Sequence, residues 1–180
     1  MIKTNKVNIL FKNRYFQVEN NQVEFNGKTN GEHLKIIPAS FEGVAVLPIM
    51  ENGMVMIQDE YRYAYNGFIT QVVKGGLKKG QTPEDAVKEE LEEELSLSFG
   101  ELIYVGKFVE HPSIVKQRGH AYIALGCKNK KESLSAEATE CFGNKRLASF
   151  DDLLKSVMNN EIECSVTQMI VLKAAFLLKN

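Results

Sequence analysis

Three glutamates, Glu90, Glu93 and Glu94, are spaced so that a helix would place them on one face. At about 100° per residue, positions i, i+3 and i+4 are neighbours on a helix surface. Carboxylates this close together repel one another unless a cation lies among them. Oxygen ligands of this type suit Mg²⁺ or Mn²⁺, which bind through a few carboxylates, waters and substrate phosphates. A metal site and a solvated acidic surface are therefore the two interpretations of this spacing.

The three glutamates belong to a larger concentration of acid in a chain that is nearly neutral. The 180 residues contain 22 Lys and Arg against 23 Asp and Glu, a formal net charge of −1. Seven of the acids lie within residues 84–94, where Lys88 alone cannot neutralise them. A sum near zero gives no basic field for nucleic acid or for an anionic membrane surface. We therefore expect neither of these as a partner.

The acidic run carries the signals of a helix that begins near Thr82. Thr82 can accept a hydrogen bond from a free backbone N–H, Pro83 suits the first helical position, and two acids in the first turn complement the helix dipole. The expected buried stripe consists of Val87, Leu91 and Leu95. Helical period also marks residues 150–158 and 166–178. The sequence therefore predicts three helices.

Strand-like segments surround these helices. Before Phe41, short alternating segments are separated by Asn20–Asn21 and Asn26–Gly27, which predict hairpin turns. Further strands are predicted at residues 43–50, 54–63, 69–73, 101–109 and 119–127. Strands, a helix, more strands and closing helices predict an α+β sandwich.

The cysteines and the N-terminal residues bear on the compartment. Cys127, Cys141 and Cys164 include no C-x-x-C pair, so neither a disulfide framework nor a cysteine zinc site is supported. The first residues lack the continuous apolar core of a signal peptide, and no segment has the apolar length of a membrane span. We expect a soluble, cytoplasmic protein.

A glycine-containing loop at residues 75–80 leads from a predicted strand into the acidic helix, and the whole segment resembles the Nudix box. That consensus is a glycine, five residues, a glutamate, seven residues, then Arg-Glu-apolar-x-Glu-Glu-x-Gly-apolar. Gly76 matches the opening glycine. The residues that fall on the metal-binding helix register are Glu90, Leu91, Glu93, Glu94 and Leu97. The resemblance implies that Glu90, Glu93, Glu94 and the Gly75 carbonyl hold Mg²⁺ or Mn²⁺.

The box is degenerate at four points. The loop is one residue shorter than the consensus, and Gln81 stands where the box has its first glutamate. Glu89 replaces an arginine that in such enzymes orients and partly neutralises the glutamates. Ser96 replaces the glycine that normally ends the helix, a change that Gly100 would absorb. These departures put metal affinity and turnover in question.

The flanks resemble the ADP-ribose pyrophosphatase branch of the Nudix hydrolase superfamily, so the likeness covers most of the chain. Arg62 matches an arginine of that branch, and Thr167 is in register with its closing helix. The resemblance implies a Nudix-type α/β/α sandwich of mixed sheets. Residues 43–180 would form the hydrolase domain. Residues 1–42 would form a small antiparallel β subdomain that helps to build a homodimer.

Another departure lies in a loop where the branch has a glutamate as a candidate general base. Gln117 occupies that position, and an amide cannot accept a proton from water at neutral pH. The possible substitutes are Glu93, Glu94, Glu110, Glu137 and Glu140. His120, ahead of an apolar strand, fits a packed histidine better than a base.

The implied function is Mg²⁺-dependent hydrolysis of the pyrophosphate in a nucleoside diphosphate linked to another moiety, such as ADP-ribose or a nucleotide sugar. Glu90, Glu93 and Glu94 would be the catalytic residues. Substrate contacts would come from Arg62, Gly76 and Gln117, although a structural ion pair accounts for Arg62 equally well. Two alternatives stay open: a catalytically weakened nucleotide- or protein-binding module, and a structural protein with an acidic surface helix.

Overall fold

A computed structural model describes residues 1–130 and 141–178 of the chain. The chain divides into two compact units. The first, which we call the N-terminal unit, contains Met1–Glu42 and Val109–Arg118. The second, the main unit, contains Gly43–Phe108 and the chain from Gly119 onward.

The N-terminal unit is built on an antiparallel sheet in which β3 pairs with the other three strands. Its strands are β1 (Ile2–Lys6), β2 (Ile9–Lys12), β3 (Phe16–Phe25) and β4 (Thr29–Pro38). Residues 114–116 run beside β4, where the N–H of Lys116 donates to the Ile36 carbonyl at 2.8 Å. This contact ties a distant segment of the chain to the unit.

One of the two predicted turns in this unit is correct and the other is wrong. Asn26 and Gly27 have φ of 52° and 69°, as a tight hairpin turn requires. Asn20–Asn21, in contrast, lies in the middle of the continuous strand β3. The buried Asn21 side chain donates to Glu19 at 2.7 Å and accepts from the Asn8 N–H at 3.0 Å. Its polar groups are thus satisfied without a turn.

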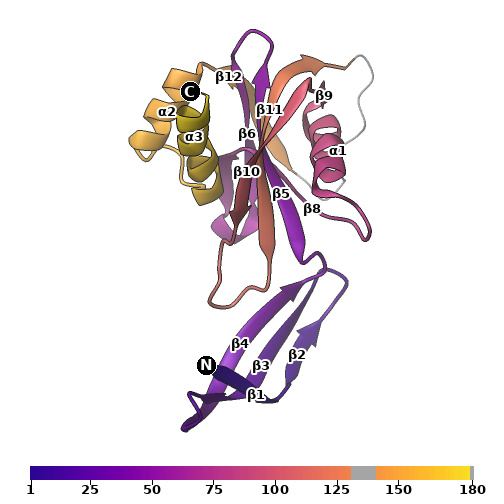
Figure 1. The fold of residues 1–180 in the computed structure, drawn as a ribbon, viewed down its shortest axis with the longest axis vertical. Coiled ribbons are helices and arrows are strands. Elements are labelled where there is room, and N and C mark those ends of the chain that lie inside the picture. The colour runs from indigo at the N-terminus through magenta and orange to yellow at the C-terminus, as the bar shows by residue number, and fades with distance from the viewer. Residues whose placement is uncertain (131–140, 179–180) are drawn as a thin grey trace. The chain divides into compact units, whose positions relative to one another are not determined.

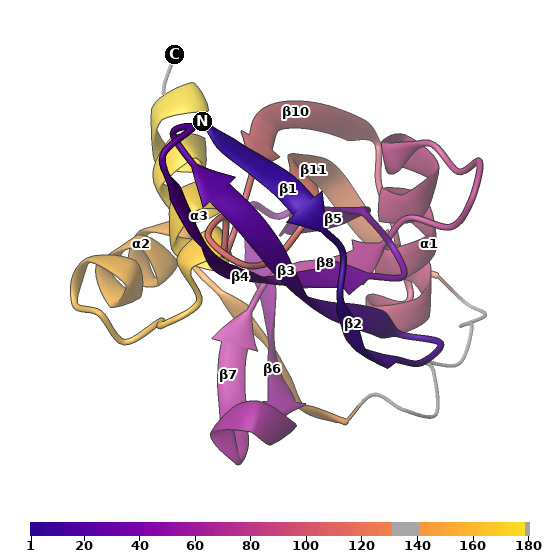
Figure 2. The same cartoon turned by 90° about the horizontal axis from the view of Figure 1, so that it is seen from below.

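The main unit is organised around an eight-stranded sheet whose path runs β10-β11-β5-β6-β12. β7, β8 and β9 pair with β6, β5 and β11. The strands are β5 (Glu42–Met50), β6 (Val55–Arg62), β7 (Gly67–Gln71), β8 (Val73–Gly76), β9 (Leu97–Ser98), β10 (Glu101–Phe108), β11 (Arg118–Asn129) and β12 (Phe142–Ala148). The single strand predicted at residues 69–73 therefore falls on parts of two strands, β7 and β8. In Figure 2 the β6–β7 hairpin projects away from the helices.

Helices cover both faces of this sheet, which confirms the predicted α+β sandwich (Figure 1). Among the described residues the α-helices are α1 (Pro83–Leu95), α2 (Phe150–Met158) and α3 (Ser165–Leu177), and Tyr63–Tyr65 form a short 3-10 turn. No helix in the described part of the chain is long and apolar enough to cross a bilayer. Helix α1 begins directly after the predicted cap Thr82, and α2 and α3 lie within one residue of their predicted bounds.

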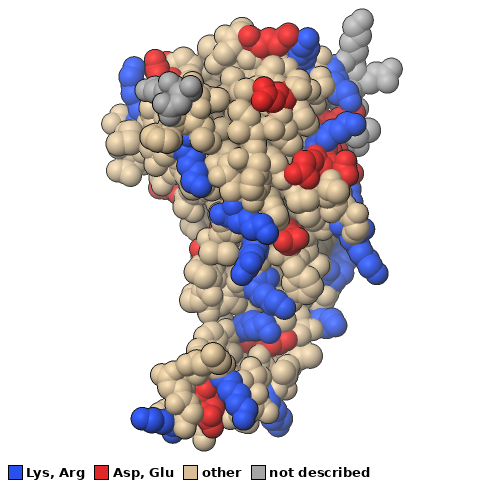
Figure 3. All heavy atoms as spheres, viewed as in Figure 1, with Lys and Arg blue, Asp and Glu red and all other residues tan. Residues whose placement is uncertain are grey.

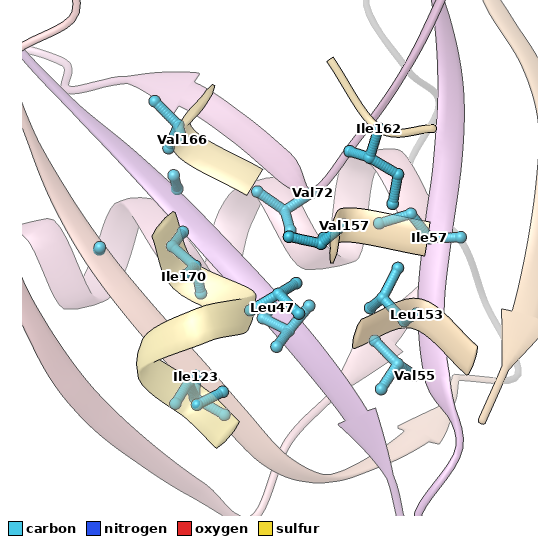
Figure 4. Packing of buried hydrophobic residues seen from close by; sticks show 14 of the residues in the cluster. Leu47, Val55, Ile57, Val72, Ile123, Leu153, Val157, Ile162, Val166 and Ile170 are labelled. Atoms are coloured by element: carbon cyan, nitrogen blue, oxygen red, sulfur yellow. The ribbon is translucent and has the colours of Figure 1, made fainter. Parts of the chain in front are cut away.

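Two apolar clusters hold the layers together. Beneath α2 and α3, a cluster around Leu47, Ile57 and Ile170 excludes water almost completely (Figure 4). Beneath α1, a second cluster includes Val46, Leu91 and the ring of Tyr122. Removal of this apolar surface from water is the main stabilising contribution to the fold.

Candidate active site

Helix α1 begins and ends where local chemistry directs it. The Thr82 hydroxyl accepts the N–H of Asp85 at 3.1 Å, and Pro83 occupies the first turn. At the other end Ser96 itself takes the left-handed conformation, with φ 56° and ψ 41°. The expectation that Gly100 absorbs the missing C-terminal glycine is therefore wrong, because Ser96 closes the helix in its place.

The predicted apolar stripe sets the orientation of this helix. Val87 and Leu91 are fully buried and Leu95 is 8% exposed, all within the cluster beneath α1. Side chains offset from this stripe by one residue lie at its margin. Glu90 and Glu94 each precede a stripe residue; Glu90 is partly exposed, whereas Glu94 is buried at 2% exposure. Glu93 lies two residues from the stripe and is partly exposed.

Gly75 and Glu90 meet at the end of β8. A Cβ atom placed on Gly75 would lie 1.7 Å from Glu90 Oε1, so only glycine leaves room for this carboxylate. Gly43 on β5 fits closely too, because its Cβ would lie 2.8 Å from the Gly75 carbonyl oxygen. Gly76 is exposed and pairs with Gly43 at the edge of the strand pair. The structure thus brings together two of the predicted metal ligands.

Glu94 is held from the sheet by a residue that sequence reasoning missed. Gln58 of β6 is fully buried, and its Nε2 donates to Glu94 Oε2. Lys145 Nζ donates to the backbone carbonyl of Glu94. Among the described residues, Gln58 Oε1 is a buried oxygen without a hydrogen-bond partner. The signal that was available is a glutamine that directly follows the apolar run Val55–Ile57 in β6.

Arg62 forms an ion pair within the sheet. Its Nη2 lies 2.7 Å from Glu60 Oε2, and Gln71 Nε2 donates to the same oxygen. Burial raises the pKa of Glu60, although Arg62 and Lys74 oppose that shift. The Arg62 side chain remains 38% exposed. The predicted structural ion pair is therefore present, and a substrate contact by this arginine stays a prediction.

Glu89, the acid in the arginine position, is paired with the preceding loop. Lys78 Nζ lies 2.6 Å from Glu89 Oε1, and Gln81 Nε2 lies 2.7 Å from Oε2. The hydrogen bonds from Lys78 and Gln81 hold the pKa of Glu89 below its ordinary value, and the bond to Glu89 raises the pKa of Lys78. Lys78 is thus not simply a solvated loop charge. Figure 3 shows acidic and basic side chains side by side over the α1 side of the main unit.

The donor set suits a hard cation, but the side chains do not form a ready cluster. Within residues 1–130 and 141–178, no group of three His, Cys, Asp or Glu side chains could hold a metal ion as arranged. The metal ligand set of Glu90, Glu93, Glu94 and the Gly75 carbonyl therefore stays a prediction. Its donors are all oxygens, and Gly75 leaves room for the Glu90 carboxylate.

Gln117 lies in the N-terminal unit, at a cavity of about 770 Å³. Its Nε2 is 3.4 Å from the Ser40 carbonyl. The lining includes Phe41, Lys116 and Arg118, so the cavity combines an aromatic ring with cations. Of the substitute bases, Glu110 belongs to this unit, whereas Glu137 and Glu140 lie outside the described residues. His120 is buried in β11, as the apolar strand around it predicted.

Comparison with known proteins assigns the fold to a family. A sequence model of the NUDIX domain matches residues 40–164, which include all of α1 and the loop before it. A crystal structure of an ADP compounds hydrolase superposes with a TM-score of 0.82 at 19% identity, covering 98% of this chain and 96% of that one. This likeness supports the architecture.

Relatives of known name are similar over most of their length. The methanol dehydrogenase activator of Bacillus methanolicus is 25% identical over 94% of this chain and 90% of its own. The ADP-ribose pyrophosphatase of Bacillus subtilis (strain 168) is 26% identical over 76% of this chain and 72% of its own. The ADP compounds hydrolase NudE of Escherichia coli (strain K12) is 26% identical over 86% and 83%.

Proposed function

We propose, since the chain belongs to the NUDIX domain family, that it hydrolyses the pyrophosphate of a nucleoside diphosphate linked to another moiety, with ADP-ribose or a nucleotide sugar as the substrate class. The observation that carries the proposal is the close approach of Glu90 to Gly75. Glu90 lies on a capped helix that also bears Glu93 and Glu94. The names of the Bacillus subtilis and Escherichia coli relatives support the same substrate class.

The residues proposed to hold Mg²⁺, or Mn²⁺ in its place, are Glu90, Glu93, Glu94 and the carbonyl of Gly75. When bound, such a cation neutralises diphosphate charge and lowers the pKa of an attacking water. Gln58 orients the Glu94 carboxylate by donating a hydrogen bond to it. Arg62, Gly76 and Gln117 are proposed to contact the substrate.

We assign the activation of water to Glu93. Gln117 cannot accept a proton at neutral pH. Glu94 is buried and already accepts a hydrogen bond from Gln58, whereas Glu93 is partly exposed on the same helix face. A base has to reach the water whose proton it takes, which favours the more accessible carboxylate.

The test is a panel of ADP-ribose, nucleotide sugars and dinucleotides, assayed for release of monophosphates with and without Mg²⁺ or Mn²⁺. Glu93→Gln is expected to lower turnover by about 100-fold, the scale of a lost general base. Glu92→Gln is the matched control, because Glu92 lies on the same helix but pairs with Lys130 at 2.6 Å. Absence of hydrolysis by the wild-type protein across the panel would contradict the proposal.

A regulatory binding protein is the second candidate. It is favoured by the similarity to the methanol dehydrogenase activator, which covers 94% of the chain, and by the departures at Gln81, Glu89 and Gln117. This candidate predicts tight ligand binding without metal or hydrolysis, unchanged by Glu93→Gln. Raised hydrolysis by Gln117→Glu would favour the enzyme instead, because it would restore a loop base.

We also propose that the protein is a cytoplasmic homodimer in which residues 1–42 take part in the interface. Apolar side chains of this segment, including Ile9, Leu10 and Phe11, are at least half exposed in the single chain. Exposed apolar surface of this kind is typical of interaction sites. Analytical sedimentation measures the oligomeric state of the full chain and of a Leu10→Lys/Phe11→Lys variant. A monomeric wild-type protein would contradict the proposed homodimer.

A further inference from the structure

The loop before α1 is fastened to the helix through both carboxylate oxygens of Glu89. Lys78 Nζ and Gln81 Nε2 each donate to one oxygen, at 2.6 Å and 2.7 Å. The same two loop residues are bonded to each other, because the Lys78 N–H donates to Gln81 Oε1 at 2.9 Å and the Gln81 N–H donates to the Lys78 carbonyl at 3.0 Å. We call this closed ring of Lys78, Gln81 and Glu89 the loop clasp.

Glu89, the acid that stands in place of the box arginine, is the acceptor in the loop clasp. With hydrogen bonds on both oxygens, Glu89 acts as an anchor for the loop. Lys78 also interacts electrostatically with Glu90 and Glu93. A positive charge that the consensus places on the helix is therefore supplied here from the loop, and the extra acid on the helix holds it.

We propose that Glu89 and Lys78 are positioning residues: the loop clasp holds residues 77–81 against α1 and thereby fixes the approach of Gly75 to Glu90. The proposal rests on the proposed function, since Gly75 and Glu90 are its suggested ligands. The loop follows Gly75 directly along the chain, so a loop released from α1 also releases the strand end that carries this glycine. Groups that orient metal ligands in this way tune affinity without touching the ion.

The sharpest test is Glu89→Arg, which restores the consensus residue of the Nudix box. A degenerate box would be repaired by this change, whereas the loop clasp would be broken, because arginine has no acceptor and repels Lys78. We expect the Mn²⁺ dissociation constant, measured by calorimetry, to rise about tenfold or more. Equal or tighter Mn²⁺ binding by this variant would overturn the proposal.

Glu92→Arg is the matched control for the charge change. It reverses the same charge on the same helix and breaks an ion pair of the same length, 2.6 Å to Lys130, outside the loop. We expect it to change the Mn²⁺ dissociation constant by less than about threefold. An effect as large as that of Glu89→Arg would assign the loss to helix charge alone and overturn the clasp.

The charge-swapped variant Lys78→Glu/Glu89→Arg tests the pair itself. The swap restores opposite charges, and Gln81 can reverse its amide because that group both donates and accepts. Mn²⁺ affinity is expected to return to within about threefold of wild type, an exposed-pair effect. A double variant no better than Glu89→Arg contradicts the proposal.

A measurement without metal separates the clasp from the metal site. Trypsin cleavage after the exposed Lys79 in metal-free protein reports how often the loop leaves the helix. Cleavage is expected to be several-fold faster in Glu89→Arg than in Glu92→Arg, and slowed again in the swapped variant; equal rates in all three overturn the clasp. Unchanged Mn²⁺ binding by Glu93→Gln would refute the proposed function, while the cleavage rates would still decide the clasp.

Discussion

The two faces of the main sheet are built from the same strands but bury different chemistry. Beneath α2 and α3 the cluster is aliphatic, with Leu47, Ile57 and Ile170 at most 1% exposed. Beneath α1 the apolar cluster adjoins Gln58 and Glu94, which are equally inaccessible to water. Burial of a polar group costs about 1–3 kcal/mol when its partner is lost. The α1 face thus buries a carboxyl group, whereas the other face buries the neutral hydroxyl of Thr167, which accepts the Val72 N–H at 3.1 Å.

An ion pair on the α2 and α3 side lies instead at an exposed edge. Arg146 pairs with Asp59 at 2.9 Å, and the arginine is 47% exposed. Water can replace such a pair at little cost. The comparison indicates that the α2 and α3 face supplies stability, while the α1 face holds carboxylates in place for chemistry.

The largest expected effect is on the aliphatic face. Leu47→Ala should lower the free energy of unfolding by about 2–5 kcal/mol, because it opens a cavity in a packed core. Urea denaturation measures the change, and Leu172→Ala, at a site 44% exposed, should stay within about 0.5 kcal/mol of wild type. A loss at Leu47 no larger than the one at Leu172 would remove the distinction between core and surface on this face.

The next effect tests the buried polar pair of the α1 face. Gln58→Leu should cost about 1–3 kcal/mol, because it removes the donor to Glu94 Oε2. The double variant Gln58→Leu/Glu94→Leu should lose much less stability than the sum of the two single variants, because no buried carboxylate is then left without its donor. Strictly additive losses in the same urea experiment would show that the two residues are not coupled.

A smaller change in stability is expected at Gly75, where a substitution alters the geometry of the candidate site and not the packing of the core. Gly75→Ala forces the flexible Glu90 side chain aside, so the free energy of unfolding should fall by under about 1 kcal/mol. Mn²⁺ affinity from calorimetry should nevertheless drop about tenfold. Gly100→Ala is the control, because its Cβ would meet only the Leu125 carbonyl at 3.6 Å. Equal Mn²⁺ affinity in the two variants would argue against Gly75 as part of the site.

The smallest effect lies at the exposed rim of the α1 face and depends on pH. Hydrogen bonds from Lys78 and then Gln81 lower the pKa of Glu89 from its ordinary value of 4.5. Its contribution is therefore present above pH 4.5 and is lost as the pH falls through the lower folded-state pKa. The free energy of unfolding of the wild type should exceed that of Glu89→Gln by about 0.2–1 kcal/mol at neutral pH. Urea denaturation should find this difference shrinking toward pH 3, and a constant difference would exclude the ionised pair as its source.

Local patterns predicted the helices and much of the sheet. The cap at Thr82 and the spacing of Val87 and Leu91 depend only on neighbours within a few turns, so the sequence indicates them directly. The same kind of local reasoning failed at Asn20–Asn21, where two residues typical of turns lie inside β3. There the pairing of β3 with three other strands outweighed the turn preference.

The sequence by itself determined that α1 presents Glu90, Glu93 and Glu94 on one face behind a glycine loop, because helical spacing and capping are local. Only the tertiary structure decided what surrounds them. Gln58 reaches Glu94 across 36 residues of chain, and Lys78 reaches Glu89 across 11. Such contacts depend on which strand lies beneath the helix and on how the loop folds back over it. The spacing of residues along the chain encodes neither of these two features. The role of Glu89 as an anchor for the loop is therefore visible only in the tertiary structure.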